Sequence, residues 1–314
     1  MKNKLNVIFM GSGLYGSLVL NSLDQSNFNI SSIFKKTNKI ISRNINKEEY
    51  LNFESHNIPI REITKFSKDD LDIIAQILPD LIIVASFGLI LPEPMLSIPN
   101  YGVINIHPSL LPKYRGPSPI SSCIVNGEKI TGVTIMKMVK ELDAGPILYQ
   151  EKIEIDSNLN SDELGIKLFE IGTNKINRLF SQNTIREITE SEQDHSQASF
   201  TKIVKKNDGQ INWGEDIQLI YRKFKAYYSW PGIYTYWNNK RIIFKEFTIE
   251  VENSLNNKIK AGKILELKND KLIVSALGGK ICVSDIQMEG GKSMKSPVFV
   301  NGRPGIIGDL FKQI

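Results

Sequence analysis

The sequence predicts an α/β protein in which a mostly parallel, doubly wound sheet is followed by a small β-barrel. Three observations lead to this prediction. The chain has 314 residues, enough for two domains of ordinary size. Its first part alternates short apolar runs with helical patterns, which is typical of a parallel sheet covered on both faces. Its last part contains short β-type runs separated by turn signals and not by helices.

The first part contains the elements of the predicted sheet. The expected strands are short runs rich in Val, Ile and Leu, at residues 5–10, 30–34, 81–85, 102–106, 130–138 and 147–155. The last two form a hairpin-like pair. The expected helices show a helical spacing of apolar residues, at residues 14–23, 69–77 and 162–180.

A polar segment separates the two predicted domains. Residues 181–208 hold few large apolar side chains, so their composition marks a linker. We therefore expect a first domain over residues 1–192, a linker over 193–208 and a second domain over 209–314. The second domain begins with a helix at 216–225. Its expected strands are residues 233–237, 242–247, 262–267, 272–276 and 280–287.

Composition and cysteine content favour a soluble protein of the cytoplasm. Hydrophobic residues make up 41% of the chain and charged residues 23%, which is ordinary for a globular protein. The apolar run at residues 7–10 is too short for a signal peptide, and no run approaches the roughly 18 apolar residues of a membrane span. Cys123 and Cys282 lie far apart without metal-ligand spacing, so we expect two free thiols.

The charge is distributed unevenly along the chain. Residues 201–314 hold 19 Lys and Arg against 11 Asp and Glu, a net charge of +8. Residues 1–200 hold 20 against 23, a net charge of −3. A basic second half favours a polyanionic partner, because cations steer such a partner and release its counterions.

A glycine-rich turn follows the first expected strand. Gly11, Gly13 and Gly16 match the letters of the dinucleotide-binding fingerprint. The acidic residue expected about 20 positions further on is missing, since the second strand ends in Phe34 and two lysines. A nicotinamide cofactor, with lysines reaching a 2′-phosphate, is therefore the weaker interpretation. A tight turn that requires small residues is the stronger one.

Three polar residues carry the strongest chemical signal. Asn105 and His107 are two residues apart near the end of an expected strand, so their side chains lie on the same side of it. The carboxyl ends of parallel strands are where open α/β sheets hold ligands. Asp143 follows in a turn between two apolar runs, where it can orient His107 or accept a proton through water.

This set of groups suits acyl transfer to an amine. Asn105 and a protonated His107 can donate hydrogen bonds to the oxyanion, each typically worth about 3–4 kcal/mol. Asp143 can take the proton that the amine loses, and a positioned base contributes roughly 10²- to 10⁴-fold. Because no serine or cysteine is placed as a nucleophile, we favour direct transfer between two bound substrates.

The motifs resemble those of the folate-dependent formyltransferases, and within that family the enzymes that act on methionyl-tRNA. The resemblance covers nearly the whole chain. It rests on Asn105-x-His107, on the Ser-Leu-Leu-Pro loop that begins at Ser109 and on Leu142-Asp143-Ala144-Gly145. Further matches are the segment FGLILP from Phe87 and the stretches RGPSPI, GVTIMKM, FTKIVKKNDGQINW, SWPG and QMEGGKSM.

The resemblance implies a Rossmann-like catalytic domain and a C-terminal barrel of oligonucleotide-binding type. The implied reaction moves a formyl group from 10-formyltetrahydrofolate to methionine on initiator tRNA, without a metal. Nothing in the sequence requires more than a monomer. The implied folate-binding residues are Phe87, Gly88, Leu89, Ile90, Ser109, Leu110, Leu111 and Pro112. The implied tRNA-binding residues are Lys35, Lys36, Lys39, Arg43, Lys205 and Lys206.

Two departures from the family pattern and three alternatives remain. Gly11-Ser12-Gly13 stands where the family has Gly-Thr-Pro, and residues 35–49 lack the family's Gly and Pro. A formyltransferase for a nucleotide-linked amino sugar would share Asn105, His107 and Asp143 but leave the basic second half unexplained. An NAD(P)-dependent oxidoreductase would rest on the glycines alone. A non-catalytic RNA-binding protein would leave the three polar residues without a purpose.

Overall fold

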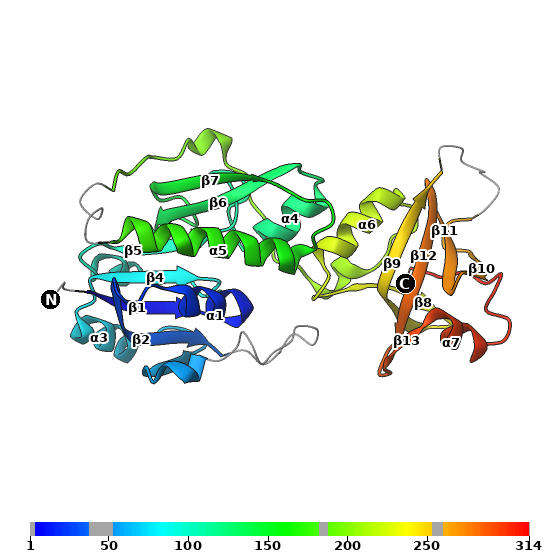
Figure 1. Cartoon of the computed structure of the whole chain (residues 1–314), viewed down its shortest axis with the longest axis horizontal. Helices are drawn as coiled ribbons and strands as arrows, with labels where there is room; N and C mark the ends of the chain where they lie inside the picture. Colours follow the sequence, from blue (N-terminus) through cyan, green and yellow to red (C-terminus); the bar gives the residue numbers. More distant parts are fainter. Residues whose placement is uncertain (1–3, 38–52, 182–187, 253–259, 314) are drawn as a thin grey trace. The chain divides into compact units, whose positions relative to one another are not determined.

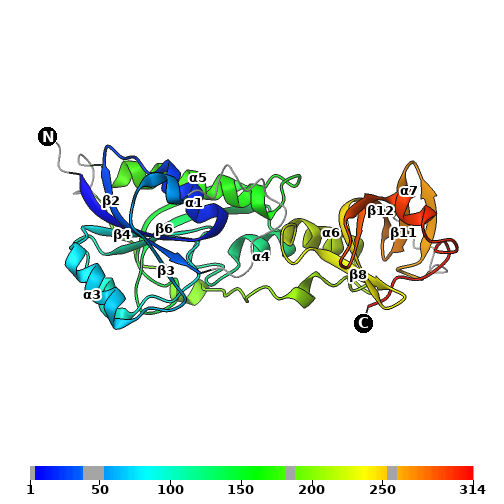
Figure 2. The same ribbon diagram turned by 90° about the horizontal axis from the view of Figure 1, so that it is seen from below.

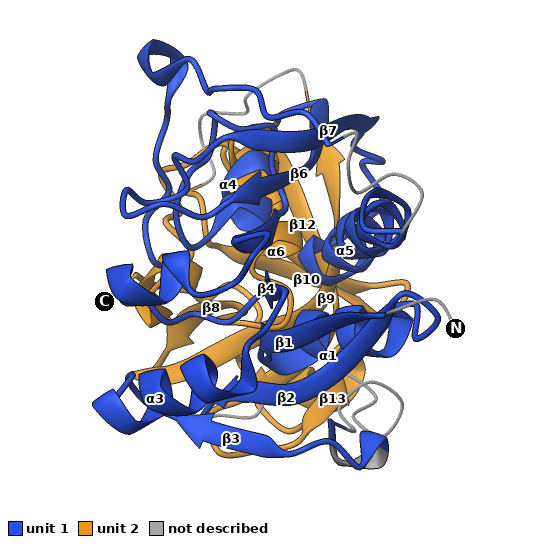
Figure 3. Cartoon of the chain, turned by 90° about the vertical axis from the view of Figure 1, so that its left-hand side faces the viewer, with its two compact units in different colours: residues 1–123, 128–203 blue, residues 124–127, 204–314 orange. Residues whose placement is uncertain are grey.

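The computed structural model describes residues 4–37, 53–181, 188–252 and 260–313. The chain forms two compact units, which Figure 3 distinguishes by colour. Unit 1 comprises residues 1–123 and 128–203, and unit 2 comprises residues 124–127 and 204–314. The division after residue 203 falls inside the predicted linker 193–208.

Unit 1 is built on a mixed seven-stranded sheet in the order β3-β2-β1-β4-β5-β6-β7, counted over the described residues. Its strands are β1 (Leu5–Gly11), β2 (Phe28–Lys36), β3 (Ile60–Ile63), β4 (Leu81–Ala85), β5 (Val103–His107), β6 (Ile130–Lys137) and β7 (Ile147–Glu154). The first five in this order run parallel to one another, β6 runs antiparallel to β5, and β7 runs antiparallel to β6. The predicted parallel core and terminal hairpin are confirmed.

Helices cover both faces of this sheet. Helices α1 (Gly13–Ser22) and α5 (Ser161–Leu179) lie together on one face, and α3 (Lys68–Ile77) lies on the other (Figures 1 and 2). Helix α4 (Pro119–Val125), which the sequence did not predict, follows the loop after β5. Asn160 begins α5 with a capping box that includes Glu163, which satisfies N–H groups of the first turn.

The glycines after β1 serve a tight turn. Gly13 has a φ of +64°, which favours glycine. A Cβ atom on Gly16 would lie 2.9 Å from the carbonyl carbon of Gly11, so the helix and strand approach too closely for a side chain. The Ser12 hydroxyl accepts a hydrogen bond from the Lys36 backbone N–H at 2.9 Å. Local packing therefore accounts for the glycine pattern.

Unit 2 is an antiparallel β structure, and its described residues after 204 include two α-helices. Its strands are β8 (Ile233–Trp237), β9 (Lys240–Val251), β10 (Ile264–Lys268), β11 (Lys271–Ala276), β12 (Gly279–Met288) and β13 (Ser293–Lys295). They run in the order β10-β11-β12-β9-β8, and β13 pairs with β12. Helix α6 (Ile217–Ala226) buries Ile220 and Phe224 in the core, and α7 (Ser296–Asn301) buries Phe299.

Residues near the C-terminus join the two edges of this sheet. Tyr236 of β8 exchanges backbone hydrogen bonds of 3.0 and 2.8 Å with Lys312. At the other edge, Ile264 of β10 donates to Asp309, and Phe311 donates to the Gly262 carbonyl, both at 2.8 Å. Because both exposed edges are paired, the sheet closes on itself, which confirms the predicted small barrel.

Two further features concern the whole described chain. Within the described residues, no helix has both the length and the apolar character needed to cross a bilayer. Cys123 and Cys282 are both free and buried.

Candidate active site

The end of β5 positions Asn105 and His107 on one face of the sheet. Val103, at the start of this strand, belongs to the core cluster that contains Ile74 of α3. Ile106 packs against Gly172 of α5 on the opposite face. Because side chains alternate along a strand, Asn105 and His107 point to the same face as Val103. Both lie toward the carboxyl end of the strand, where the sheet is open to ligands.

His107 is fixed through one ring nitrogen. The residue is 4% exposed, and its Nε2 lies 2.9 Å from the Tyr114 carbonyl oxygen. A carbonyl oxygen can only accept, so Nε2 carries a proton. In the neutral ring this leaves Nδ1 as the basic nitrogen. Nδ1 lies 3.7 Å from Oδ2 of Asp143, so a proton gained there would face a carboxylate.

Asp143 lies in a strained turn between β6 and β7. Its φ is +48°, a left-handed conformation that aspartate tolerates better than most residues. The Gly116 backbone N–H donates to its Oδ2 at 2.7 Å, which fixes the carboxylate on the side of His107. The structure thus brings together His107 and Asp143, which are far apart in the sequence, as the two motifs led us to expect.

Asn105 lies two residues before His107 and is half-buried. Its backbone is held between β4 and β6, opposite Val84 and Met136. The side chain makes no hydrogen bond to any residue that the structure describes. Its amide is therefore available to a substrate.

The loop after His107 is held by two residues that the sequence interpretation did not single out. The hydroxyl of Thr134 on β6 donates to the Ser109 carbonyl at 2.6 Å and accepts from the Leu111 N–H at 3.2 Å. The Gln150 amide on β7 donates to the Leu111 carbonyl at 2.8 Å. A polar residue facing a loop from a strand has no local sequence signature, which explains why both were missed.

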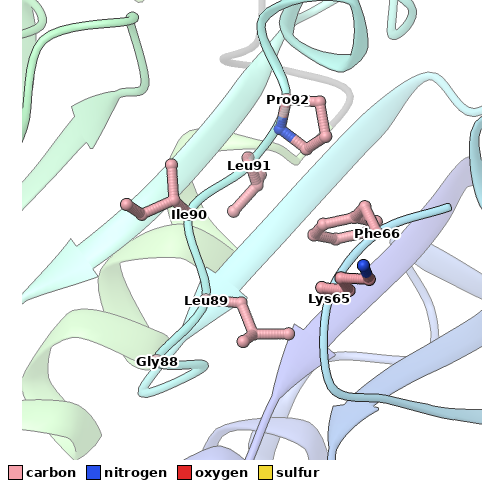
Figure 4. Close-up of a pocket in the computed structure, with 7 residues that line it drawn as sticks. All are labelled: Lys65, Phe66, Gly88, Leu89, Ile90, Leu91 and Pro92. Carbon is pink, nitrogen blue, oxygen red and sulfur yellow. The ribbon is translucent and has the colours of Figure 1, made fainter.

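An apolar pocket of about 480 Å³ lies beside the loop that follows β4 (Figure 4). It is lined by Lys65, Phe66, Gly88, Leu89, Ile90, Leu91 and Pro92. Phe66, Leu89 and Leu91 surround the space, whereas the Ile90 side chain is 90% exposed and points away. Three of the predicted folate residues, Gly88, Leu89 and Ile90, line this pocket. Phe87 is instead buried in the core, and residues 109–112 lie outside the lining.

The predicted tRNA-binding residues fall in different places. Lys36 donates to the Gly88 carbonyl at 3.0 Å, and Lys35 pairs with Glu62 at 3.0 Å. Lys205 and Lys206 are exposed at a short 3₁₀ helix (Lys206–Gly209) at the start of unit 2. Two others, Lys39 and Arg43, lie outside the described residues.

Two protein families match this chain. Residues 3–178 match the family described as Formyl transferase, and residues 203–304 match the family described as Formyl transferase, C-terminal domain. The two matches cover the sheet with its helices in unit 1 and most of the barrel in unit 2.

Curated relatives match the chain over nearly its full length. The methionyl-tRNA formyltransferases of Caldicellulosiruptor saccharolyticus and Thermotoga maritima are each 34% identical to it over 313 residues. In both comparisons the alignment covers 98% of this chain and 99% of the relative.

Solved structures share the fold at lower sequence identity. HypX from Aquifex aeolicus in complex with tetrahydrofolic acid has a TM-score of 0.59 and 14% identity, over 99% of this chain and 51% of HypX. WlaRD, a sugar 3N-formyl transferase, has a TM-score of 0.59 and 18% identity, over 90% of this chain and 98% of WlaRD.

Proposed function

The chain belongs to the formyl transferase family, among the methionyl-tRNA formyltransferases, and we propose that it formylates the α-amine of methionine carried by initiator tRNA. The formyl donor in this proposal is 10-formyltetrahydrofolate. The observation that supports it most is the proximity of His107 and Asp143 at the carboxyl end of β5, on the sheet face that Asn105 shares.

In the proposed reaction the amine nitrogen attacks the formyl carbon directly. The carbonyl oxygen becomes an oxyanion, which accepts hydrogen bonds from the Asn105 amide and from a protonated Nδ1 of His107. Asp143 stabilises the imidazolium ring from 3.7 Å and accepts, through water, the proton that the amine loses. The carbonyl then re-forms as the bond from the formyl carbon to N10 of the folate breaks. N10 receives, through water, the proton that Asp143 took from the amine, and tetrahydrofolate leaves.

The pocket beside the β4 loop supports a folate donor. Flat aromatic rings bind well to concave apolar surfaces, and Phe66, Leu89 and Leu91 provide one here. Lys36 holds the Gly88 carbonyl of the same loop, which steadies the lining. We assign the donor's ring system to this pocket and keep the loop at Ser109, Leu110, Leu111 and Pro112 as its second contact.

The charge of the second half supports a tRNA acceptor. The net charge of +8 over residues 201–314 suits a phosphate backbone, and Lys205 and Lys206 expose their side chains at the start of that segment. Neither lysine forms an ion pair with a residue that the structure describes, so both are available to phosphates.

A nucleotide-linked amino sugar is the second candidate acceptor, because WlaRD shares the fold. The full-length identity to methionyl-tRNA formyltransferases favours tRNA. The test measures release of tetrahydrofolate from 10-formyltetrahydrofolate with each acceptor offered separately. Release with methionyl-tRNA alone supports the proposal; release with the sugar alone overturns the acceptor assignment, and release with neither overturns the activity.

A further inference from the structure

Gln193 is a buried residue in a segment of polar composition. It is 4% exposed, although its neighbours Glu192 and Asp194 are exposed. Its amide nitrogen donates to two carbonyl oxygens of the turn that carries Asp143: to Asp143 itself at 2.9 Å and to Gly145 at 2.7 Å. One side chain therefore ties together the backbone on both sides of Ala144.

The orientation of this amide is determined by Arg115. The Gln193 Oε1 accepts from Nε of Arg115 at 3.1 Å and from Nη2 at 2.6 Å. A guanidinium group can only donate, so it requires the amide oxygen on its own side and leaves the amide nitrogen facing the Asp143 turn. Arg115 is itself 4% exposed, and Nη2 also lies 3.1 Å from Nδ1 of His195.

The backbone next to Arg115 holds the side-chain carboxylate of Asp143. Gly116 donates to the carboxylate Oδ2 at 2.7 Å, while Gln193 holds the carbonyl of the same residue. Arg115 is fixed in turn, since its N–H donates to Ser199 at 2.8 Å and its carbonyl accepts from Thr201 at 2.7 Å. A left-handed φ of +48° needs such support, because sparsely populated conformations persist only where the surroundings enforce them.

We propose that Gln193, oriented by Arg115, is a positioning residue that holds the Asp143 carboxylate at its working distance from His107. The inference rests on the proposed function, because it assumes that Asp143 assists the transfer. Gln193 touches neither His107 nor the reacting atoms, so it acts through the turn. A displacement of about 1 Å in a catalytic group can lower a rate by about 100-fold.

The test replaces Gln193 with glutamate. Gln193→Glu keeps an oxygen acceptor for Arg115 but presents an oxygen, in place of the N–H donors, to the carbonyls of Asp143 and Gly145. We expect kcat to fall about 10- to 100-fold, with KM for both substrates changed less than about 3-fold because the substrate contacts remain. The matched control is Gln197→Glu, an exposed glutamine in the same segment, which should retain wild-type kcat.

A double-mutant cycle separates positioning from a general loss of structure. If Gln193 acts through Asp143, then Gln193→Glu added to Asp143→Asn should lower kcat by less than about 3-fold beyond Asp143→Asn alone. The positioning role is overturned if the kcat losses of the two single variants multiply in full in the double variant. It is also overturned if Gln193→Glu keeps wild-type kcat while Asp143→Asn is impaired. If Gln193→Glu does not fold, Arg115→Lys replaces it in the same cycle. This change removes the two guanidinium donors that hold Gln193 Oε1, and the same result is expected.

The outcomes also distinguish the two proposals from each other. Wild-type protein without formyl transfer, or Asp143→Asn with full activity, would mean that the proposed function or mechanism is wrong. An impaired Asp143→Asn with an unaffected Gln193→Glu would leave that mechanism standing and remove Gln193 from it.

Discussion

His107 Nδ1 lies 3.7 Å from Asp143 Oδ2, while the Tyr114 carbonyl holds the other ring nitrogen at 2.9 Å. The longer distance exceeds that of a direct hydrogen bond but allows a strong attraction between charges. A hydrogen on Nδ1 would therefore face the carboxylate across this gap. In the proposed mechanism, this N–H and the Asn105 amide both donate to the oxyanion.

Replacing Asn105 tests the oxyanion interaction. Asn105→Ala removes an amide that makes no hydrogen bond to the described residues, so folding should be little affected. We expect kcat to fall about 100- to 1,000-fold, as for other donors of this kind, with the KM of methionyl-tRNA nearly unchanged. Steady-state kinetics measure both values. A rise in KM with unchanged kcat would show that Asn105 binds substrate equally in the ground and transition states.

The support of the loop at Ser109 can be tested through stability. Thr134 is fully buried, and Thr134→Val removes the hydroxyl that satisfies the Ser109 carbonyl and the Leu111 N–H. We expect the free energy of unfolding to fall by about 1–3 kcal/mol, measured by urea denaturation. Thr248→Val, at an exposed position of β9, is the control and should change it by less than about 0.5 kcal/mol. Equal effects would contradict the role of Thr134.

We expect Asp70 to make the stability of unit 1 depend on pH. Burial alone would raise the pKa of Asp70, but hydrogen bonds from the Ser67 hydroxyl and backbone and from Arg61 hold it below its usual value of about 3.9. A lowered folded-state pKa stabilises the protein above the unfolded-state value, and this contribution is lost as pH falls through the folded-state value.

Asp70→Asn should therefore destabilise the protein at pH 7 by about 1–3 kcal/mol, and the difference from wild type should shrink below about pH 3.9. Urea denaturation at several pH values measures this dependence. Asp69→Asn, at the exposed neighbouring position, provides the control. A difference that stays constant with pH would show that the carboxylate charge is not involved.

The basic segment at the start of unit 2 can be tested by charge reversal. Lys205→Glu with Lys206→Glu should weaken tRNA binding and make the slope of log K against log salt shallower by up to about 2. Filter binding at several salt concentrations gives this slope. Lys152→Glu with Lys167→Glu changes the net charge equally at exposed sites of unit 1. An unchanged slope in the first pair would place these lysines away from the tRNA path.

The sequence predicted the fold well where burial leaves a continuous pattern. Strands such as β4 (Leu81–Ala85) are buried at every residue and consist of apolar residues alone. Strand β3 was missed because its four residues lie at the sheet edge and include Arg61 and Glu62. The barrel itself was predicted, but the segment that closes it, residues 309–312, was not assigned because isolated bridges carry no alternating pattern.

In the candidate site, too, some residues could be predicted from the sequence and others could not. Asn105, His107 and Asp143 carry recognisable chemistry, so their residue types and spacing were enough to select them. Thr134 and Gln193 act through hydrogen bonds to residues about 25 or 50 positions away, as the Thr134–Ser109 and Gln193–Asp143 contacts show. Gln193 also lies among exposed polar residues. The composition of such a segment predicts that it is exposed as a whole and does not single out one buried residue.

The central claim is that Asn105, His107 and Asp143 carry out formyl transfer on a tRNA-bound amine. The most direct test measures turnover with methionyl-tRNA and the Kd for the same tRNA in His107→Ala. The account predicts a loss in kcat of at least about 100-fold with unchanged tRNA affinity. Near-wild-type turnover in His107→Ala would contradict it and remove the imidazole from the mechanism.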